Sequence, residues 1–318
     1  MPASHPAGMR KLLFIALAAL VSAPLAAQSA DAPFTIAETG KGYRSLQAAV
    51  SAIGDGQGTI VIAPGEYRMC AVQDKGDITY RAAEPGTVVF DAKTCEGKGA
   101  FVLRGAAATV EGLTFQNMRV ADQNGAGIRL EHGNLTVRES LFRDSESGIL
   151  SGSDPEGTIL VEQSTFANLG GCPSDCSHSI YAGGYGSLVV RRARFEQGSG
   201  GHYVKSRAAR IEVSDSSFDD SAGRGTNYMI DLPNGATGRI AGNSFVQGKD
   251  KENYSAMIVV AAEGVVNSSA GLQVADNEAQ LAPGVENGTS FVADLSGETI
   301  RIAENRLGDR IARFERRN

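Results

Sequence analysis

The sequence predicts an all-β fold built as a solenoid, and three observations lead to it. First, a motif of an aliphatic residue, any residue and Val or Ile, followed five positions later by an apolar residue, recurs after 23 to 34 residues. Its copies end at Val110/Phe115, Val137/Phe142, Val161/Phe166, Val190/Phe195, Val213/Phe218, Ile240/Phe245, Val274/Ala279 and Ile302/Leu307. Second, apolar and polar residues alternate within each copy, which is strand periodicity. Third, no helical pattern separates the copies. Such short strands bury their apolar faces only by stacking, and this repeat length accommodates three strands with their turns, which predicts a right-handed parallel β-helix.

The first 27 residues have the pattern of a secretory signal. Arg10 and Lys11 precede an apolar run over 12–21, and small residues follow through Ala27. The run is too short to span a bilayer. We therefore expect a periplasmic or secreted protein in which residues 28–318 form one β-helix domain without a transmembrane segment after cleavage. Cleavage after Ala30 and a start at Met9 stay open.

The two ends of the solenoid differ in their sequence patterns. Residues 43–53 have apolar side chains at helical spacing, which predicts a short amphipathic helix that caps the first coil. Residues 59–67 follow as a strand and a turn. Residues 311–317 would either cap the other end or form a basic tail. Near that end, Asn243, Asn277 and Asn305 occupy the same repeat position, which predicts a ladder of side-chain hydrogen bonds.

Four cysteines in an exported chain indicate two disulfides. Cys70 and Cys95 lie almost one coil apart, so neighbouring coils would bring them within bridging distance. Cys172 and Cys176 would close a very short loop. The alternative for this second pair is a metal site that also includes His178.

The formal net charge of -6 becomes -8 once Arg10 and Lys11 are removed, which argues against general nucleic-acid binding. Residues 188–210 nevertheless carry six basic side chains and one acidic one. This segment predicts a basic patch for an anionic polysaccharide. The plain alternative is a set of solvated strand faces.

A second strand column predicts a candidate site. Aligned inward positions are Ile128, Ile149, Ile180, Val204, Ile230 and Ile258. The next residue on each strand then faces outward. Stacking therefore gathers seven residues from three adjacent coils: His178, Tyr181, His202, Lys205, Arg207, Tyr228 and Asp231. The structural alternatives are histidines satisfied within the core, tyrosines that only pack, and a plain salt bridge between Lys205 and Asp231.

Four segments carry a family resemblance: SHSIYAG from Ser177, GHYVKSRA from Gly201, YMIDLPNG from Tyr228 and NSFVQG from Asn243. They resemble exported bacterial right-handed parallel β-helix proteins of the pectate-lyase-like superfamily, over residues 35–264. Lys205 is also loosely similar to the lysine of the alginate lyase and chondroitinase B family, where a Lys acts as base beside an Arg. That family's calcium ligands are not evident here. The polygalacturonase pattern is also absent, since Tyr203 replaces its second glycine.

These residues favour a polysaccharide lyase that cleaves a uronate polymer by β-elimination. Arg207 would neutralise the sugar carboxylate, Lys205 or His202 would act as base, and Tyr181 or Tyr228 would donate a proton to the leaving oxygen. Lys205 could be the base only if its pKa were lowered, which Asp231 opposes.

Other functions stay open. A C5-epimerase needs nearly the same groups, and a non-catalytic polysaccharide-binding or envelope-structural protein needs none of them. A glycoside hydrolase would need Asp231 together with Asp219 or Asp220. No cofactor motif is evident, and calcium stays open.

Overall fold

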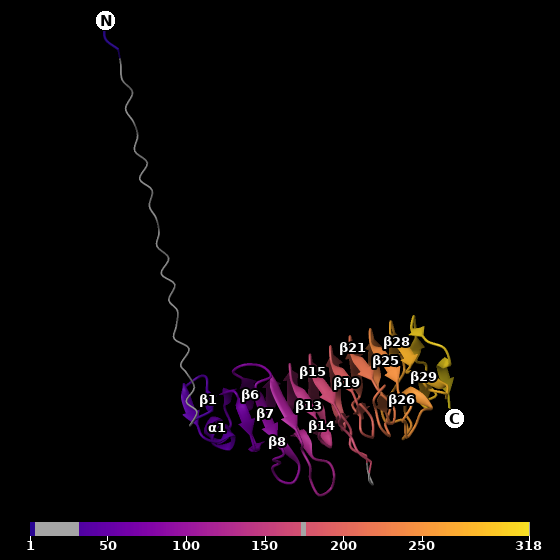
Figure 1. The fold of residues 1–318 in the computed structure, drawn as a ribbon, viewed down its shortest axis with the longest axis horizontal. Helices are drawn as coiled ribbons and strands as arrows, with labels where there is room; N and C mark the ends of the chain where they lie inside the picture. Colours follow the sequence, from indigo (N-terminus) through magenta and orange to yellow (C-terminus); the bar gives the residue numbers. More distant parts are fainter. Residues whose placement is uncertain (4–31, 173–175, 318) are drawn as a thin grey trace.

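The computed structural model describes residues 1–3, 32–172 and 176–317. It confirms a parallel β-helix, in which each coil gives one strand to each of three sheets (Figure 1). The predicted signal segment falls almost wholly on residues 4–31, outside the described residues. No helix among the described residues is long and apolar enough to cross a membrane.

Sheets A, B and C run along the axis of the solenoid. Sheet A contains, in spatial order, β2 (Lys41–Tyr43), β1 (Phe34–Ile36), β3 (Gln57–Ile62), β6 (Asp77–Ala82), β9 (Ala107–Glu111), β12 (Asn134–Arg138), β15 (Asp154–Glu162), β18 (Tyr185–Arg191), β21 (Arg210–Ser214), β24 (Thr237–Ala241), β27 (Gln273–Ala275) and β30 (Arg301–Ile302). Sheet B contains β4 (Gly65–Tyr67), β7 (Val88–Asp91), β10 (Leu113–Gln116), β13 (Leu141–Arg143), β16 (Thr165–Ala167), β19 (Arg194–Glu196), β22 (Ser217–Asp219), β25 (Ser244–Gln247), β28 (Glu278–Leu281) and β31 (Arg306–Leu307). Sheet C contains β5 (Ala71–Gln73), β8 (Gly99–Leu103), β11 (Ala126–Leu130), β14 (Ser147–Ser151), β17 (Ile180–Ala182), β20 (Val204–Ser206), β23 (Ile230–Leu232), β26 (Ala256–Val260), β29 (Thr289–Asp294) and β32 (Ile311–Arg316).

The repeat motif sets the register of sheets A and B. Val137 pairs with Val110 and Val161 in sheet A, and Phe142 pairs with Phe115 and Phe166 in sheet B. The phenylalanine rings form a buried stack with centroid spacings of 4.7 to 5.1 Å, through Phe115, Phe142, Phe166, Phe195, Phe218 and Phe245. The core is therefore continuous along the axis.

The predicted asparagine ladder is confirmed. Asn243 Nδ2 donates to Asn277 Oδ1 at 3.0 Å, and Asn277 Nδ2 donates to Asn305 Oδ1 at 2.9 Å. The same amides bond backbone groups at the turn, because Asn277 Oδ1 also accepts from the backbone N–H of Asn243. Both Asn243 and Asn277 are buried, so the ladder satisfies polar groups that water does not reach.

The cap at the first coil is helix α1, Leu46–Ile53, which buries Leu46, Ala49 and Val50. It begins three residues later than predicted because Ser45 is its N-cap and accepts a hydrogen bond from the backbone N–H of Ala48. At the other end, residues 311–316 form β32, which pairs in parallel with β29. That segment is therefore the last strand of sheet C and not a free tail.

Both predicted disulfides are present. Cys70–Cys95 joins Cα atoms 5.5 Å apart, and Cys172–Cys176 joins Cα atoms 4.1 Å apart. Neither pair is available as free thiolates. The proposed metal site at the second pair therefore loses its sulfur ligands.

Candidate functional site

The candidate site lies on the outer face of sheet C over strands β17, β20 and β23. Register pairs Tyr181 with Lys205, and Lys205 with Asp231. The predicted inward column is also confirmed, since Ile180, Val204 and Ile230 pair in sequence. These strands therefore present one outward side chain each, on adjacent coils.

The turns that lead into these strands carry a stack of rings. His178 and His202 have centroids 5.0 Å apart, and His202 and Tyr228 have centroids 5.5 Å apart. Gly201 makes this approach possible: it has a φ of 63°, and a Cβ there would lie 2.1 Å from the carbonyl oxygen of Ser177. Only a residue without a side chain lets the turn of His202 rest directly on that of His178.

His178 is held as a neutral imidazole. Its Nδ1 accepts a hydrogen bond from the backbone N–H of His202 at 3.0 Å, so the ring carries its proton on Nε2. Burial, with the charges of Lys205 and Arg207, lowers the pKa of His178 to about 3. His178 can therefore donate from Nε2 but cannot act as a base through Nδ1.

His202 and Asp231 form a buried pair of titratable side chains. His202 Nε2 lies 3.4 Å from Asp231 Oδ2, and its Nδ1 lies 3.3 Å from the carbonyl oxygen of Tyr228. Both neighbours are acceptors, whereas a neutral imidazole has one N–H. Burial lowers the pKa of His202 well below its usual value and raises the pKa of Asp231. The arrangement thus keeps His202 in the neutral form that a general base requires.

Lys205 carries a stable positive charge. Its Nζ lies 3.1 Å from Asp231 Oδ2 and 2.7 Å from Glu263 Oε1. Burial alone lowers the pKa of Lys205, but the two carboxylates outweigh this effect and the pKa is raised. A lysine base needs the opposite shift. Of the two candidate bases, His202 is the one whose protonation state suits the role.

Arg207 makes three hydrogen bonds in different directions. Its Nε donates to Tyr181 Oη at 2.8 Å, Nη1 donates to Asn234 Oδ1 at 2.5 Å, and Nη2 donates to Glu263 Oε2 at 2.5 Å. The guanidinium also lies over the ring of Tyr181, 5.9 Å from its centroid. Arg207 is therefore fixed beside Lys205, with Glu263 between the two cations.

All seven predicted residues belong to one chain of contacts. The remaining link is the stacking of His178 on Tyr181, with centroids 5.7 Å apart. Sequence reasoning missed Glu263, Asn234 and Asn253, whose Nδ2 donates to Tyr228 Oη at 2.7 Å. These three lie outside the strands that carry the repeat, so no periodic signal could locate them.

Two positions of sheet C that the strand alternation predicts to face outward are more buried than that prediction implies. Asp231 is 3% exposed, and its Oδ1 has no hydrogen-bond partner. Val259, on the next coil, is fully buried in a small cluster with Ala256 and Ala293 on which Tyr228 packs. The outer face of sheet C is thus covered at Asp231 and Val259. Lys205, Arg207 and Glu263 are the site's more accessible charged groups, with side-chain exposures of 12%, 27% and 44%.

The basic segment 188–210 does not form one patch. Arg191 lies on β18 of sheet A and pairs with Glu212, whereas Arg194 lies on β19 of sheet B and pairs with Glu196. Lys205 lies on sheet C. A single coil wraps around all three faces, so neighbours in sequence point in different directions.

The aspartates considered for a hydrolase are separated from Asp231. Asp219 lies on β22 of sheet B. Asp220 is fully buried, accepts a hydrogen bond from Tyr203 Oη at 2.8 Å and lies 3.2 Å from Lys251 Nζ. Asp220 therefore serves an internal ion pair.

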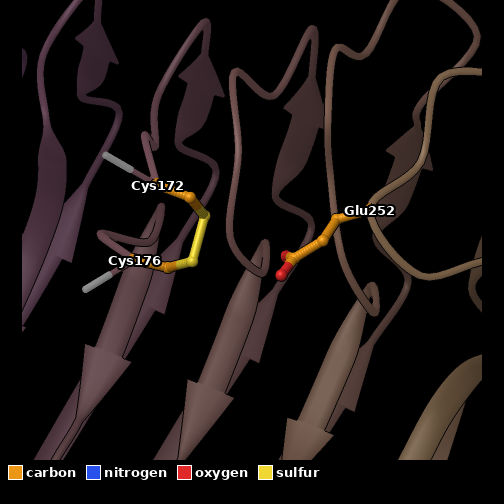
Figure 2. A group of neighbouring side chains, drawn as sticks. All are labelled: Cys172, Cys176 and Glu252. Atoms are coloured by element: carbon orange, nitrogen blue, oxygen red, sulfur yellow. A yellow bond between two sulfur atoms is a disulfide. The ribbon is translucent and has the colours of Figure 1, made fainter. Parts of the chain in front are cut away.

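The described residues contain one group with metal-ligand spacing, Cys172, Cys176 and Glu252 (Figure 2). Its sulfurs are joined in a disulfide and are not the thiolates that bind metals. Calcium prefers several oxygen ligands. At the candidate site, the carboxylates of Asp231 and Glu263 share the ammonium of Lys205, so these residues do not suit calcium.

Comparison with known proteins supports the fold. Residues 98–279, more than half of the chain, match the family model described as "Right handed beta helix region". No curated protein matches the sequence.

Similar solved structures include the PL6 family alginate lyase AlyGC, at 16% identity and a TM-score of 0.52, over 79% of this chain and 36% of that one. The ORF18 protein of Geobacillus virus E2 is similar at 10% identity and a TM-score of 0.49, over 84% and 57%. Pectate lyase Pel9A is similar at 15% identity and a TM-score of 0.43, over 83% and 74%. The chain thus spans about a third of the alginate lyase's length, and the likeness at these identities concerns the fold.

Proposed function

Since the chain belongs to the right-handed β-helix region family, we propose that it is a polysaccharide lyase that cleaves a uronate-containing polymer by β-elimination. One observation carries the proposal. Lys205 and Arg207 together hold a carboxylate, that of Glu263, beside a neutral histidine and a tyrosine hydroxyl. A carboxylate is the group that distinguishes a uronate from a neutral sugar.

The reaction needs three functions, and the site offers a group for each. Lys205 and Arg207 neutralise the sugar carboxylate, which acidifies the neighbouring C5–H bond. With the proton of the neutral ring on Nδ1, which faces the carbonyl oxygen of Tyr228, Nε2 of His202 accepts the C5 proton. Asp231 stabilises the imidazolium that forms, because its Oδ2 lies 3.4 Å from Nε2. Tyr181 Oη accepts from Arg207 and so keeps its own proton free to donate to the leaving oxygen. The C4–O bond then breaks as the C4–C5 double bond forms.

The alginate lyase named above, which shares the fold at 16% identity, supports the class of reaction. At that identity the substrate of this chain has to be found by experiment. We propose an anionic polysaccharide as the partner and export to the periplasm or beyond as the localisation. The two disulfides support an oxidising compartment.

A panel of uronate and neutral polysaccharides tests the function. Wild-type protein should release unsaturated ends, detected by ultraviolet absorbance, from a uronate polymer and from none of the neutral ones. Lys205→Ala and His202→Ala should each lower turnover by at least about a hundredfold, the scale for losing a positioned catalytic group. Circular dichroism must accompany both variants, since His202 is buried.

Lys98→Ala is a matched control, because Lys98 also bridges two carboxylates, those of Glu96 and Glu131. It should keep wild-type turnover. New reducing ends without unsaturation would indicate a hydrolase, and exchange of the C5 proton without cleavage would indicate an epimerase. Retention on the polymer with neither product would indicate a binding protein, which the closed ion-pair network around Glu263 also suits.

A further inference from the structure

Glu263 holds an unusual position relative to the rest of the site. It lies in the connection between β26 and β27, and its carboxylate reaches residues 58 and 56 positions earlier in the chain, Lys205 and Arg207. One oxygen faces each cation. Lys205 and Arg207 are thus both occupied by a carboxylate of the protein itself.

Hydrogen bonds fix the backbone around Glu263, whereas the Glu263 side chain is held only through its carboxylate. The backbone N–H of Glu263 donates to the carbonyl oxygen of Pro233 at 2.9 Å, and that of Val266 donates to Asn234 at 3.0 Å. The side chain is 44% exposed. Rotation about its own bonds would release the carboxylate into water without any movement of the loop.

We propose that Lys205 and Arg207 form a carboxylate-binding subsite, that Glu263 occupies it in the free protein, and that the carboxylate of a uronate residue displaces Glu263 on binding. The proposal rests on the function proposed above and names the contact that the substrate must replace. Exchange of one carboxylate for another leaves neither cation unpaired. It also avoids stripping water from two bare charges, which would be costly at a half-buried position.

The displaced group competes with the ligand, and this gives the test. Glu263→Gln removes the negative charge and keeps the shape of the side chain. Charge-assisted hydrogen bonds exceed neutral ones in strength, so a uronate trisaccharide should bind Glu263→Gln about tenfold more tightly than wild type. Glu263→Asp keeps the charge but is one methylene shorter and cannot span both cations, so its affinity should fall between the two. Calorimetric titration at low salt measures all three.

Glu212→Gln is the control, because Glu212 also lies between two arginines, Arg191 and Arg239, but on sheet A. It should bind the trisaccharide as wild type does. A neutral trisaccharide should show no gain with any variant. Thermal unfolding of each variant establishes that it is folded.

The outcomes separate this inference from the lyase proposal. Unchanged or weaker binding by Glu263→Gln overturns the inference, and Glu263 then serves to position Arg207, whether or not the wild type cleaves a polymer. Tighter binding of uronates by Glu263→Gln in a protein that cleaves none of the panel keeps the subsite and rejects the lyase. Equal gains for sulfated and carboxylated sugars would overturn the assignment to carboxylates.

Discussion

The neutral state of His178 makes a quantitative prediction about acid stability. The side chain is 7% exposed and has a folded-state pKa of about 3, whereas a histidine in an unfolded chain titrates near 6.5. Between these two pKa values, His178 is therefore protonated in the unfolded state and neutral in the folded state. Stability from this residue is complete above pH 6.5 and is lost as the pH falls from about 6.5 toward 3.

The size of the loss follows from those two pKa values. Relative to pH 8, His178 alone should cost about 1 kcal/mol at pH 6 and about 2 kcal/mol at pH 5. At pH 5 the paired carboxylates contribute little, since Glu131, for example, has its pKa lowered to about 2 by Lys98 and by Arg104. His202 adds to the loss in the same direction, because burial lowers its pKa too.

His178→Asn removes the contribution of His178, together with the part of the lowered pKa of His202 that comes from His178. The amide oxygen of Asn can still accept the backbone N–H of His202, which now bonds Nδ1 at 3.0 Å. Any packing defect in the variant is the same at both pH values and cancels. Urea unfolding followed by circular dichroism should show that wild type loses at least about 2 kcal/mol more than His178→Asn between pH 8 and pH 5. Exposed His132 gives the control His132→Asn, which should lose as much as wild type.

Equal losses for wild type and His178→Asn would refute the reasoning. They would mean that His178 is solvated or paired when protonated. The conclusion that His178 is held as a neutral imidazole in the stack of rings would then be wrong.

Three further outcomes are expected. If the chain is a lyase with His202 as base, kcat/KM should stay on a plateau below pH 6.5, because the lowered pKa keeps the imidazole neutral there; an acidic limb centred above pH 7 would contradict this. Asn277→Ala should lower the free energy of unfolding by about 3 kcal/mol, because it strands the buried N–H of Asn243, whereas the half-buried Asn305→Ala should cost less. Phe166→Ala should cost about 4 kcal/mol in urea unfolding, since its ring is fully buried between two others, and a loss below about 2 kcal/mol would show that the stack tolerates a gap.

The repeat made the strand register predictable from sequence. Tyr181, Lys205 and Asp231 are more than 20 residues apart in turn, yet they are direct neighbours because each follows an inward residue of the same column. The asparagine ladder was predictable for the same reason. A residue that lies on a periodic strand has its neighbours determined by the period.

What lies outside the period could not be located in this way. Glu263 sits in a connection whose path depends on hydrogen bonds to the turn at Pro233, and no spacing rule indicates that it reaches Lys205. The inward–outward alternation of the strand also predicted the direction of the Asp231 side chain but not its burial. That alternation is a property of a single strand, whereas burial depends on which neighbouring segments cover the side chain.

Each of three successive coils contributes one outward residue of sheet C to the site, and this has an evolutionary consequence. Tyr181, Lys205 and Asp231 come from three successive coils at a rise of roughly 4.8 Å each. Duplication of a coil beyond either end would lengthen the surface available to a polymer and leave these three together. Duplication between them would keep the hydrophobic stacking intact yet separate the reacting groups by one rise. The position of the duplicated coil therefore decides whether the protein gains only binding surface or also loses the arrangement of its catalytic groups.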